Sequence, residues 1–423
     1  MDKTRVLLAA PLPPPTGGIA VWTDILLRDM HQHPDLEIHH VDTALRWKKR
    51  VDLNSGARLI GGILQAFWDI LRVGLALVRY RPHVLHLTTS AGFASVKDAV
   101  ILYLARRLGA AGYIHYHTSI LGNGQLQGWQ LRAAHLAMRF AARVLVLDDH
   151  THTALQPRIA AQKLQILPNM IELERIDDVC ARRVKSGWQT APGEGLRCVY
   201  VGRVVADKGI VEQLQACAQL PGVRLDIVGP VDAEYRQYLQ HFAKGQKQRQ
   251  WLHFHGGVDH DEVYGYIQQS DVLLLPSYHE AFPYVVLEGM ALGKPVVVSN
   301  VGAMPEMIDA AGDQPCGLCV APRDADSLRD ALQQLIDVPA TRSAMGQAGR
   351  RRVEHLYDIP PVLRQIKALW QADHAPSPTP DLTQGVPPFP PVQYLAKRPN
   401  DIDLNLRFAV ALDKPRVNCH SRQ

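Results

Sequence analysis

Long hydrophobic runs, paired cysteine motifs and basic stripes are all scarce in this 423-residue sequence. No stretch reaches the ~18 to 20 uninterrupted apolar residues of a membrane span, because Asp69, Arg72 and Arg79 interrupt the most apolar region. Of the six cysteines only Cys316 and Cys319 are closely spaced, and without a second pair they favour a buried turn and strand over a zinc site. Basic residues do not form a stripe with interleaved aromatics, which disfavours nucleic-acid binding.

The N-terminal segment MDKTRVLLAAPLPPPTGG also lacks the pattern of a secretory signal. Its short apolar run breaks at prolines and has no small-residue cleavage site, so we expect the chain to stay in the cytosol. Any membrane contact is then peripheral. The length exceeds the roughly 250 to 300 residues at which single cores stop growing, so two domains are expected. The net charge of +5 is small, but a basic cluster suggests an anionic surface as partner; it comprises Arg46, Lys48, Lys49 and Arg50 beside Trp47.

Short apolar runs alternate with longer amphipathic stretches, as buried parallel strands alternating with covering helices would. The pattern predicts an α/β fold. In the first half, the expected strands are Arg5 to Ala10, Ile38 to Val41, His83 to Leu87, Tyr113 to Tyr116, Val144 to Leu147 and Leu164 to Leu167. In the second half, they are Arg197 to Val201, Arg224 to Val228, Trp251 to His255, Val272 to Leu275 and Pro295 to Ser299.

The polar stretch from Asn169 to Gly195 is interpreted as the connection between two Rossmann-like domains. We expect one domain at 1–180, a second at 195–356 and a helix at 357–373 that returns to the first domain. Prolines in residues 374–423 predict a disordered tail. Ligands of open α/β sheets bind beyond the carboxyl ends of the strands, so two facing sheets predict a cleft with donor and acceptor on opposite walls.

The segment EAFPYVVLEGMALGKPVVVS, residues 280–299, follows the apolar strand DVLLLPS. A first helical position for Pro283 would leave the N–H groups of Tyr284 and Val285 free to face a phosphate. Glu288, ~7 to 8 Å further along the helix, could accept hydrogen bonds from ribose, and Glu280 from the sugar. The alternative is that Glu280 caps the helix and Glu288 lies on a solvated face, although apolar neighbours make an unpaired Glu288 costly.

The segment VYVGRVVADKGI, residues 199–210, places Arg203 and Lys208 on one loop after a strand. A departing diphosphate needs its charge neutralised, which the bidentate fork of arginine and the point charge of lysine can do in place of a metal ion. Two ordinary surface cations are the alternative. Weaker signals are Gly17 and Gly18, where a loop could approach a ligand closely, and His117 at the end of IHYHTS. Ordinary turn glycines and a satisfied core or surface histidine are the respective alternatives.

Together these motifs resemble a GT-B-fold retaining glycosyltransferase of glycosyltransferase family 4. The resemblance runs from about residue 5 to 372 and is most specific at residues 202–209, at 280–288 and in the run FHGGVDHDEVYGYIQQSDVLLLPS between them. It implies two Rossmann-like domains with parallel sheets facing across a cleft, of which 1–180 is the acceptor-side domain and 195–356 the nucleotide-sugar-binding domain. It also implies a UDP- or GDP-sugar donor and no catalytic metal or other cofactor. It also implies front-face attack, in which the departing phosphate oxygen accepts the proton of the acceptor.

The resemblance assigns roles to individual residues. Arg203 and Lys208 would hold the diphosphate, Glu288 the ribose, and Glu280 the hydroxyls of the sugar near the reacting carbon. His117 would lie beside the donor sugar. The remaining donor-site residues implied are Gly17, Gly18, Gly257, Val258, Phe282, Tyr284 and Val285.

The sequence departs from the family pattern in three places. A Pro13-Pro14-Pro15 run precedes the glycine pair, Met170 follows Asn169 where glycine is common, and Pro230 follows Gly229. These departures concern the acceptor preference and the base contacts more than the reaction.

The prediction is therefore sugar transfer to a glycan or lipid-linked acceptor in cell-surface polysaccharide or glycolipid synthesis. A GT-B enzyme of another reaction, either an epimerase or a phosphorylase, and a non-catalytic nucleotide-sugar-binding protein remain the alternatives. Residues 57–80 have the composition of an interfacial helix at an anionic membrane, and equally of a packed domain helix.

Overall fold

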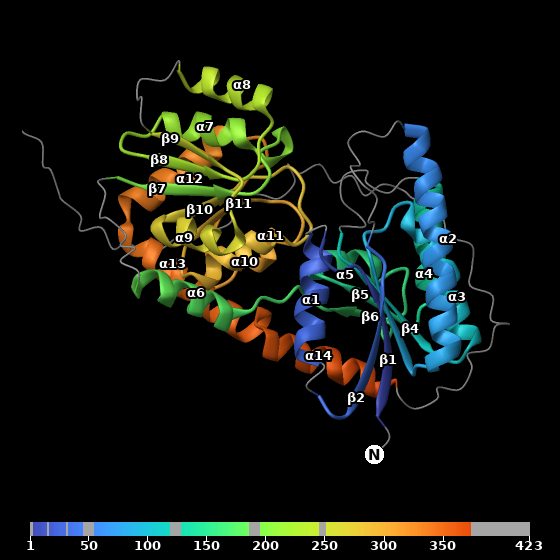
Figure 1. Cartoon of the computed structure of the whole chain (residues 1–423). Helices are drawn as coiled ribbons and strands as arrows, with labels where there is room; N and C mark the ends of the chain where they lie inside the picture. The colour runs from blue at the N-terminus through green and yellow to red at the C-terminus, as the bar shows by residue number, and fades with distance from the viewer. Residues whose placement is uncertain are drawn as a thin grey trace, which may run out of the picture. The chain divides into compact units, whose positions relative to one another are not determined.

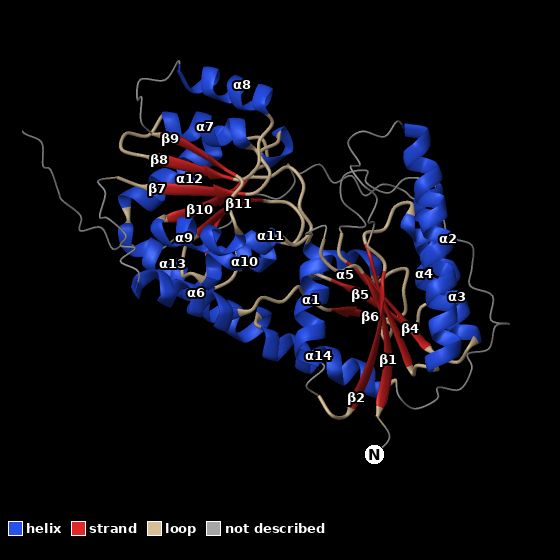
Figure 2. Ribbon diagram, in the orientation of Figure 1, coloured by secondary structure: helices blue, strands red, loops and turns tan. Residues whose placement is uncertain are grey.

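The computed structural model describes residues 3–14, 17–30, 33–44, 55–118, 128–185, 195–244 and 251–373. These residues form two six-stranded parallel sheets with interleaved helices (Figure 2), which confirms the predicted α/β class. The first sheet has the strand order β2-β1-β3-β4-β5-β6 and the second β12-β11-β10-β7-β8-β9. The basic cluster at 46–50 and the proline-rich residues from 374 onward lie outside the described residues.

The first sheet is built by the first half of the chain (Figure 1). Helices α1 and α14 cover one face, and α2, α3 and α4 cover the other. Its strands are β1 (Thr4–Ala10), β2 (Leu36–Asp42), β3 (Val84–Thr89), β4 (Ala111–Tyr116), β5 (Arg143–Val146) and β6 (Leu164–Ile166). The helices are α1 (Gly18–Met30), α2 (Ser55–Tyr80), α3 (Ala94–Arg107), α4 (Trp129–Phe140), α5 (Asp149–Leu155) and α14 (Ile359–Ala372).

Strand β1 shows why such runs become central strands. Val6 and Leu8 belong to the core that includes α1 and α14, whereas Leu7 and Ala9 belong to the core under α2 and α3. Successive side chains of a strand point to opposite faces, so a continuous apolar run buries both faces of the sheet at once. All four side chains are fully buried, as the sequence pattern predicts.

The second sheet is built by the second half of the chain. Its strands are β7 (Arg197–Val201), β8 (Arg224–Val228), β9 (Leu252–Gly256), β10 (Val272–Leu275), β11 (Val296–Ser299) and β12 (Gly317–Val320). The helices are α7 (Ile210–Ala218), α8 (Ala233–Lys244), α9 (His260–Gln269), α10 (Tyr284–Ala291), α11 (Met304–Met307), α12 (Ala325–Asp337) and α13 (Pro339–Arg352). A 3-10 turn, η1 (Ala206–Lys208), precedes α7, and a π-helical segment, η2 (Val353–Tyr357), follows α13. The predicted strand series omitted β12, which holds Cys319.

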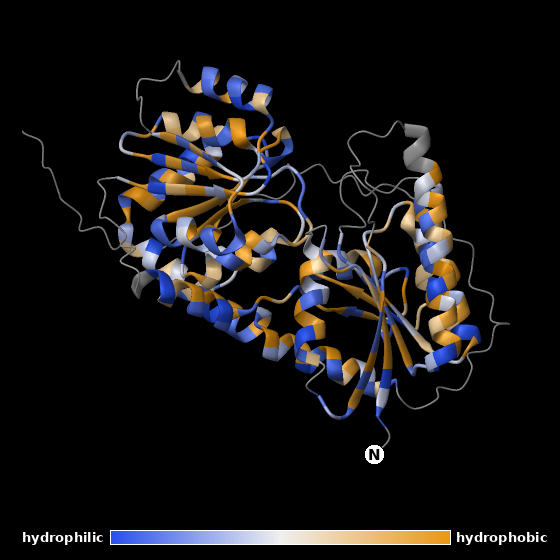
Figure 3. Cartoon of the chain, viewed as in Figure 1, coloured by the Kyte–Doolittle hydropathy of each residue, from blue (hydrophilic) through white to orange (hydrophobic). Residues whose placement is uncertain are grey.

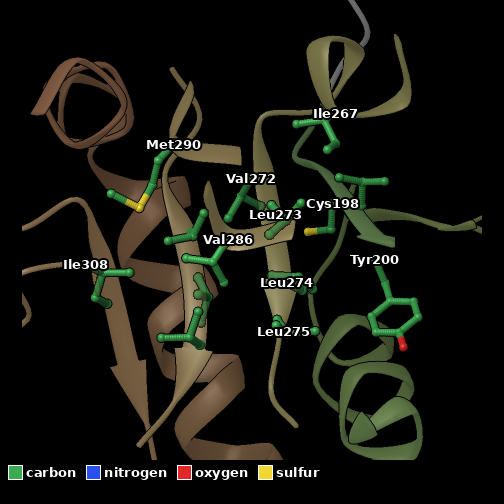
Figure 4. Packing of buried hydrophobic residues seen from close by; sticks show 14 of the residues in the cluster. Cys198, Tyr200, Ile267, Val272, Leu273, Leu274, Leu275, Val286, Met290 and Ile308 are labelled. Carbon is green, nitrogen blue, oxygen red and sulfur yellow. The ribbon is translucent and has the colours of Figure 1, made fainter. Parts of the chain in front are cut away.

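The core of this half is centred on β10. Figure 4 shows Val272 and Leu273 of this strand beside Cys198 of β7, with Val286 and Met290 of α10 packed nearby. These side chains are completely shielded from solvent. Burying a large apolar side chain stabilises a fold by about 1.5 to 3 kcal/mol, so this packing fixes both β10 and the start of α10, where the predicted site lies.

The connection between the two sheets is more structured than predicted. Helix α6 (Leu173–Lys185) occupies its first part, and residues 186–194 lie outside the described chain. Leu173, Ile176 and Val179 of α6 are buried in the core of the second half. Their spacing of three residues places them on one helix face, a period that the polar residues between them conceal.

Helix α14 leaves the second half and packs in the core of the first. Its Trp370 is fully buried, and the indole Nε1 donates a hydrogen bond to His86 Nδ1 at 3.1 Å. Beyond its end, both carboxylate oxygens of Asp373 accept from Arg143, at 2.8 and 3.0 Å. The pKa of Asp373 is lowered although its burial alone would raise it, because Arg143 and the Tyr113 hydroxyl donate to the carboxylate.

Helix α2 corrects one expectation from the sequence. Residues Ile60–Tyr80 are long and apolar enough to cross a membrane by length and composition, despite the three interrupting charges, although 28% of the apolar window is buried inside the protein. No second helix of this kind occurs in the described parts of the chain.

Candidate active site

The loop that carries Lys208 is held against the end of β10. Lys208 ends the η1 turn, and Gly209 follows it with a φ of +65°. A Cβ at this position would collide with the carbonyl oxygen of Pro276, immediately after β10. Glycine alone tolerates both the left-handed backbone and this close approach, so residue 209 brings Lys208 to the carboxyl edge of the second sheet.

Glu280 lies in the loop between β10 and α10. Gly302, with a φ of +56°, packs so closely that an added Cβ would collide with the Glu280 carbonyl oxygen. Loops after β10 and β11 therefore interlock at this residue. The side chain of Glu280 accepts a hydrogen bond from Lys208 Nζ, with 2.6 Å between Nζ and Oε1.

This ion pair joins the two motifs that the sequence analysis singled out. Lys208 and Glu280 are 72 residues apart, yet their side chains meet and retain only 19% and 15% of their exposure. A partly buried pair is screened less by salt than a surface pair. Arg203, on the same loop as Lys208, is exposed, and its guanidinium forms no ion pair within the described chain.

The start of α10 differs in detail from the prediction. Pro283 has extended backbone angles, φ −73° and ψ 126°, and is the N-cap rather than the first helical residue. Tyr284 takes the first position because the extended ψ of Pro283 delays the helix by one residue. The N–H groups of Tyr284 and Val285 still belong to the first turn, where a helix offers no internal acceptor. These N–H groups are therefore available to an anion.

Glu288 is buried on α10 and has a partner that the sequence analysis missed. Only 4% of the residue is exposed, and its Oε1 lies 3.1 Å from His260 Nε2, at the start of α9. The hydrogen bond to Glu288 raises the pKa of His260 despite the partial burial of the ring. The solvated-face alternative for Glu288 is therefore wrong. Asp259 and His260 lie at the start of α9, and Tyr264 lies about one turn further along. No local sequence pattern indicates that His260 reaches α10.

His117 follows β4 and is held in one orientation by Asn169. Asn169 Nδ2 donates to the Phe282 carbonyl at 3.1 Å, so its Oδ1 faces His117 Nδ1, also at 3.1 Å. The Nδ1 nitrogen must then carry the ring proton, which leaves Nε2 as an acceptor. Burial lowers the pKa of His117 to about 3, so the ring is neutral near pH 7. It can accept a hydrogen bond there but does not act as an acid.

The polar atoms buried without a partner in the described chain include His117 Nε2 and the hydroxyl of Tyr284, the first residue of α10. Leaving a buried polar group unpaired costs about 1 to 3 kcal/mol. A sugar hydroxyl could donate to the histidine, and the Tyr284 hydroxyl could donate to a phosphate or sugar oxygen. Burial together with the charge of Glu288 raises the pKa of Tyr284, which keeps its hydroxyl protonated.

The glycine pair of the first half lies against the same helix start. Gly17 precedes α1, and a Cβ added there would meet no atom within 4 Å. Gly18 begins α1, and its added Cβ would lie 3.6 Å from the ring of Tyr284. The structure therefore brings residues 18 and 284 together, as the resemblance implies. The backbone of Gly17 remains open to a ligand.

The other predicted donor-site residues have less direct positions. Phe282 is 6% exposed, with its ring against Tyr357 and its carbonyl bound by Asn169, so its side chain is a core element. Val285 and Val258 pack against the core of the second half, and an added Cβ at Gly257 would contact Pro230 at 3.9 Å. Within the described chain, neither Gly257 nor Val258 forms a hydrogen bond with Lys208 or Glu280. The same loop does supply His260 to Glu288.

The described residues contain no group of three or more histidine, cysteine, aspartate or glutamate side chains arranged to hold a metal ion. Cys316 is buried just before β12 and Cys319 lies within β12, as the turn-and-strand interpretation predicts, but Cys319 is exposed rather than buried.

Comparisons with known proteins place this architecture in a class. The structure superposes on sucrose-phosphate synthase from Thermosynechococcus elongatus with a TM-score of 0.66 at 19% identity. The superposition covers 88% of this chain and 99% of the synthase chain. It also superposes on Anabaena HepE, solved with UDP-glucose, with a TM-score of 0.64 at 19% identity. This superposition covers 87% of this chain and 99% of the HepE chain. The fold is GT-B.

Residues 187–352 match the model of the family "Glycosyl transferases group 1". The chain thus carries a glycosyl transferases group 1 domain, which includes every predicted site residue of the second half. Glycogen synthase of Mycobacterium tuberculosis is 29% identical over 55% of the chain and 53% of its own length. A GDP-mannose-dependent phosphatidylinositol monomannoside mannosyltransferase of Corynebacterium glutamicum is 30% identical over 44% of the chain and 51% of its own length. The chain therefore spans about half the length of these relatives.

Proposed function

We propose that the protein is a retaining glycosyltransferase of family 4 type, which moves a sugar from UDP or GDP to a glycan or lipid-linked acceptor. The observation that carries the proposal is the 2.6 Å contact between Lys208 and Glu280. It joins a loop suited to a diphosphate with a carboxylate suited to sugar hydroxyls. Relatives that are named as sugar transferases, and HepE with its bound UDP-glucose, support the donor class.

The diphosphate would lie between the cationic loop and the first turn of α10. Arg203, with no ion pair in the described chain, would provide a bidentate contact, and Lys208 a point charge. Amides of residues 284 and 285 would add the positive end of the helix dipole. These groups need little reorganisation as charge builds on the departing phosphate, so they would stabilise the transition state more than the ground state.

The sugar would lie between Glu280 of the second half of the chain and His117 of the first half. Glu280 would accept hydrogen bonds from hydroxyls near the reacting carbon, and the neutral His117 would accept one at Nε2. Glu288, aligned by His260, would accept from the ribose. None of these groups is needed as a strong base if the departing phosphate oxygen takes the proton of the acceptor. The C–O bond to phosphate then breaks as the C–O bond to the acceptor forms on the same face.

The donor is tested by thermal unfolding of the purified full chain with a panel of UDP- and GDP-sugars. A donor that binds only the folded state stabilises it by about 2.7 kcal/mol at a concentration one hundred times its Kd. We expect one nucleotide-sugar to raise the melting temperature in a concentration-dependent way. Arg203→Ala should lose most of that shift, whereas Arg236→Ala, an exposed arginine of α8, should retain it.

If no nucleotide-sugar stabilises the protein, the proposed donor class is wrong. Product analysis then separates the reactions of the fold. A transferase requires an acceptor, an epimerase alters the nucleotide-sugar without one, and a phosphorylase requires free phosphate. Binding of a donor without turnover for any acceptor would indicate a non-catalytic nucleotide-sugar-binding protein.

Activity should persist in excess chelator, because Arg203, Lys208 and the α10 amides would neutralise the departing diphosphate without a metal. The measurement compares initial rates of sugar transfer with and without EDTA, after dialysis to remove bound cations. Re-addition of Mg²⁺ to the dialysed enzyme serves as the control. Complete loss in EDTA with recovery on Mg²⁺ addition would contradict the cationic loop as the charge-neutralising group.

The acceptor and the place of reaction complete the proposal. A lipid-linked acceptor would be met at the cytosolic face of a membrane, by an enzyme in peripheral contact with it. The surface features that support such contact are separate from the sugar-transfer site.

A further inference from the structure

Exposed large hydrophobic side chains are concentrated on one side of the first half. Along α2, seven of them are 52–62% exposed: Ile60, Ile63, Leu64, Phe67, Trp68, Leu75 and Val78. Their spacing of three or four residues forms one stripe along the helix. In the rest of the described chain, outside α2 to α4 and the residues that flank these helices, the only exposed large hydrophobics are Tyr238, Val338 and Leu356.

Helices α3 and α4 extend this apolar surface. Helix α3 packs against both α2 and α4. Val96 and Tyr103 on α3 are 50% and 45% exposed, and Phe93, just before α3, forms an edge-on ring pair with Trp129 at the start of α4. Phe93 itself is 69% exposed. Figure 3 shows the hydrophobic colouring along these helices. We call the exposed apolar side chains of α2, α3 and α4, with Phe93, the docking face.

The charges of these three helices have one sign wherever they are exposed. Their only acidic residues, Asp69 and Asp98, are 1% and 0% exposed. Exposed arginines include Arg79 on α2, Arg107 on α3, and Arg132 and Arg139 on α4. An apolar surface with only basic residues around it is complementary to a layer of anionic headgroups over hydrocarbon. The exposed aromatic rings suit the boundary between the two.

The other side of α2 prevents it from leaving the protein to span a membrane. Val73, Ala76 and Leu77 are buried in the first-half core. Lys97 Nζ of α3 lies 2.6 Å from the buried Asp69 carboxylate, which fixes α2 to α3. A helix with one face packed on a sheet and the other face apolar can lie flat on a membrane surface.

A second copy of the chain fits this face less well. In a two-fold dimer the same patch would face itself, which would bring the arginines of both copies together. Like charges at an interface disfavour association, whereas an anionic lipid surface attracts them.

We propose that α2, α3 and α4 form a docking face that binds the surface of an anionic lipid bilayer, with the apolar stripe of α2 inserted between headgroups. The proposal rests on the proposed function in one respect: membrane binding would bring the enzyme to a lipid-linked acceptor. Lipid binding itself requires no sugar transfer and can be measured without it.

The test is co-flotation of the full chain with vesicles of phosphatidylcholine alone or with 30% phosphatidylglycerol. Binding to anionic vesicles should exceed binding to neutral ones by at least roughly 10-fold, because the exposed arginines are attracted to the anionic headgroups. Ile63→Ser/Phe67→Ser/Leu75→Ser should lower binding to the anionic vesicles by at least about 10-fold, since three apolar contacts are lost. The matched control Tyr238→Ser/Val338→Ser/Leu356→Ser removes the exposed hydrophobics elsewhere and should bind as the wild type does.

A second pair of variants tests the charges. Arg132→Gln/Arg139→Gln should weaken binding to anionic vesicles by roughly 10-fold and leave the weak binding to neutral ones unchanged. The control Arg236→Gln/Arg364→Gln removes two exposed arginines of α8 and α14. Circular dichroism checks that each variant is folded. A melting shift with nucleotide-sugar that survives in the Ile63/Phe67/Leu75 variant would separate docking from donor binding.

Three results would overturn the docking proposal. The wild type could fail to float with anionic vesicles, the apolar variant could float as well as its control, or the arginine variant could bind as the wild type does. If the wild type is dimeric without lipid and the apolar variant is monomeric, the face is an interface between copies. Failure of these lipid assays would leave the proposed sugar transfer untouched, because the two use different residues and readouts.

Discussion

Replacing Arg203 with alanine is expected to lower the turnover of sugar transfer by roughly 10² to 10³, with little loss of stability. Arg203 is exposed and forms no ion pair in the described chain, so its removal leaves no buried charge unpaired. Loss of one preorganised group that stabilises transition-state charge typically has an effect of this size. The measurement is kcat and KM with the donor found by thermal unfolding.

Arg203→Lys and Arg236→Ala are the controls for this experiment. Lysine keeps a positive charge but not the bidentate fork, so Arg203→Lys should retain an intermediate rate. Arg236→Ala should match the wild type. Near-normal turnover of Arg203→Ala would show that the diphosphate is held elsewhere. A rise in KM with unchanged kcat would assign Arg203 to binding of the ground state rather than to the departing charge.

Much of the fold could be predicted because the buried strands correspond to short continuous apolar runs in the sequence. All eleven strands of the predicted series are present, with ends within two residues. Strand β12 was omitted from the series because Gly317 and Cys319 interrupt its short apolar run. Helix α6 was not predicted because its buried residues, three apart, alternate with arginines and aspartates. In both cases tertiary packing supplies the stability that the local pattern does not show.

The site residues could be predicted where a sequence motif lies directly after a predicted strand. Lys208, Glu280 and Glu288 each follow a strand end or lie in the helix after it, and parallel strands place such residues at one edge of the sheet. Pairing across long sequence distances was not predictable. His260 reaches Glu288, and Asn169 links His117 to the Phe282 carbonyl, through contacts that no spacing in the sequence encodes. Asn169 was noted only as the start of the inter-domain connection and as the residue before the unusual Met170, yet it sets the tautomer of His117.

The burial of three histidines predicts that stability falls as the pH drops below about 6.5. His86 and His115 are fully buried, and His117 is shielded next to them. Burial lowers the pKa of His86 to about 3 and that of His115 well below its ordinary value. Trp370 donates to His86 Nδ1, and His115 Nε2 lies 3.1 Å from the Leu167 carbonyl, so both rings are paired in their neutral forms.

The direction follows from which state binds the proton. Between pH 6.5 and about 3, the unfolded chain protonates these histidines and the folded chain does not, so acid favours unfolding. For His86 the loss is about 1.4 kcal/mol for each pH unit below 6.5, or about 2 kcal/mol at pH 5. Asp98 acts in the opposite direction, because burial raises its pKa to about 6 and the folded chain takes up that proton first. Protonation of Asp98 raises the free energy of unfolding by about 1 kcal/mol at pH 5. His115 and His117 add to the loss, so a net fall is expected.

Urea unfolding of the full chain at several pH values between 7 and 5 measures this effect as the slope of the unfolding free energy against pH. His86→Asn keeps a hydrogen-bonding side chain at the position but does not titrate, so its slope should be smaller by about one proton whatever its absolute stability. His150→Gln, an exposed histidine of α5, should leave the slope unchanged. Equal slopes for the wild type and His86→Asn would mean that His86 is protonated in the folded protein, and the neutral Trp370–His86–His115 arrangement that joins α14 to the first sheet would be wrong.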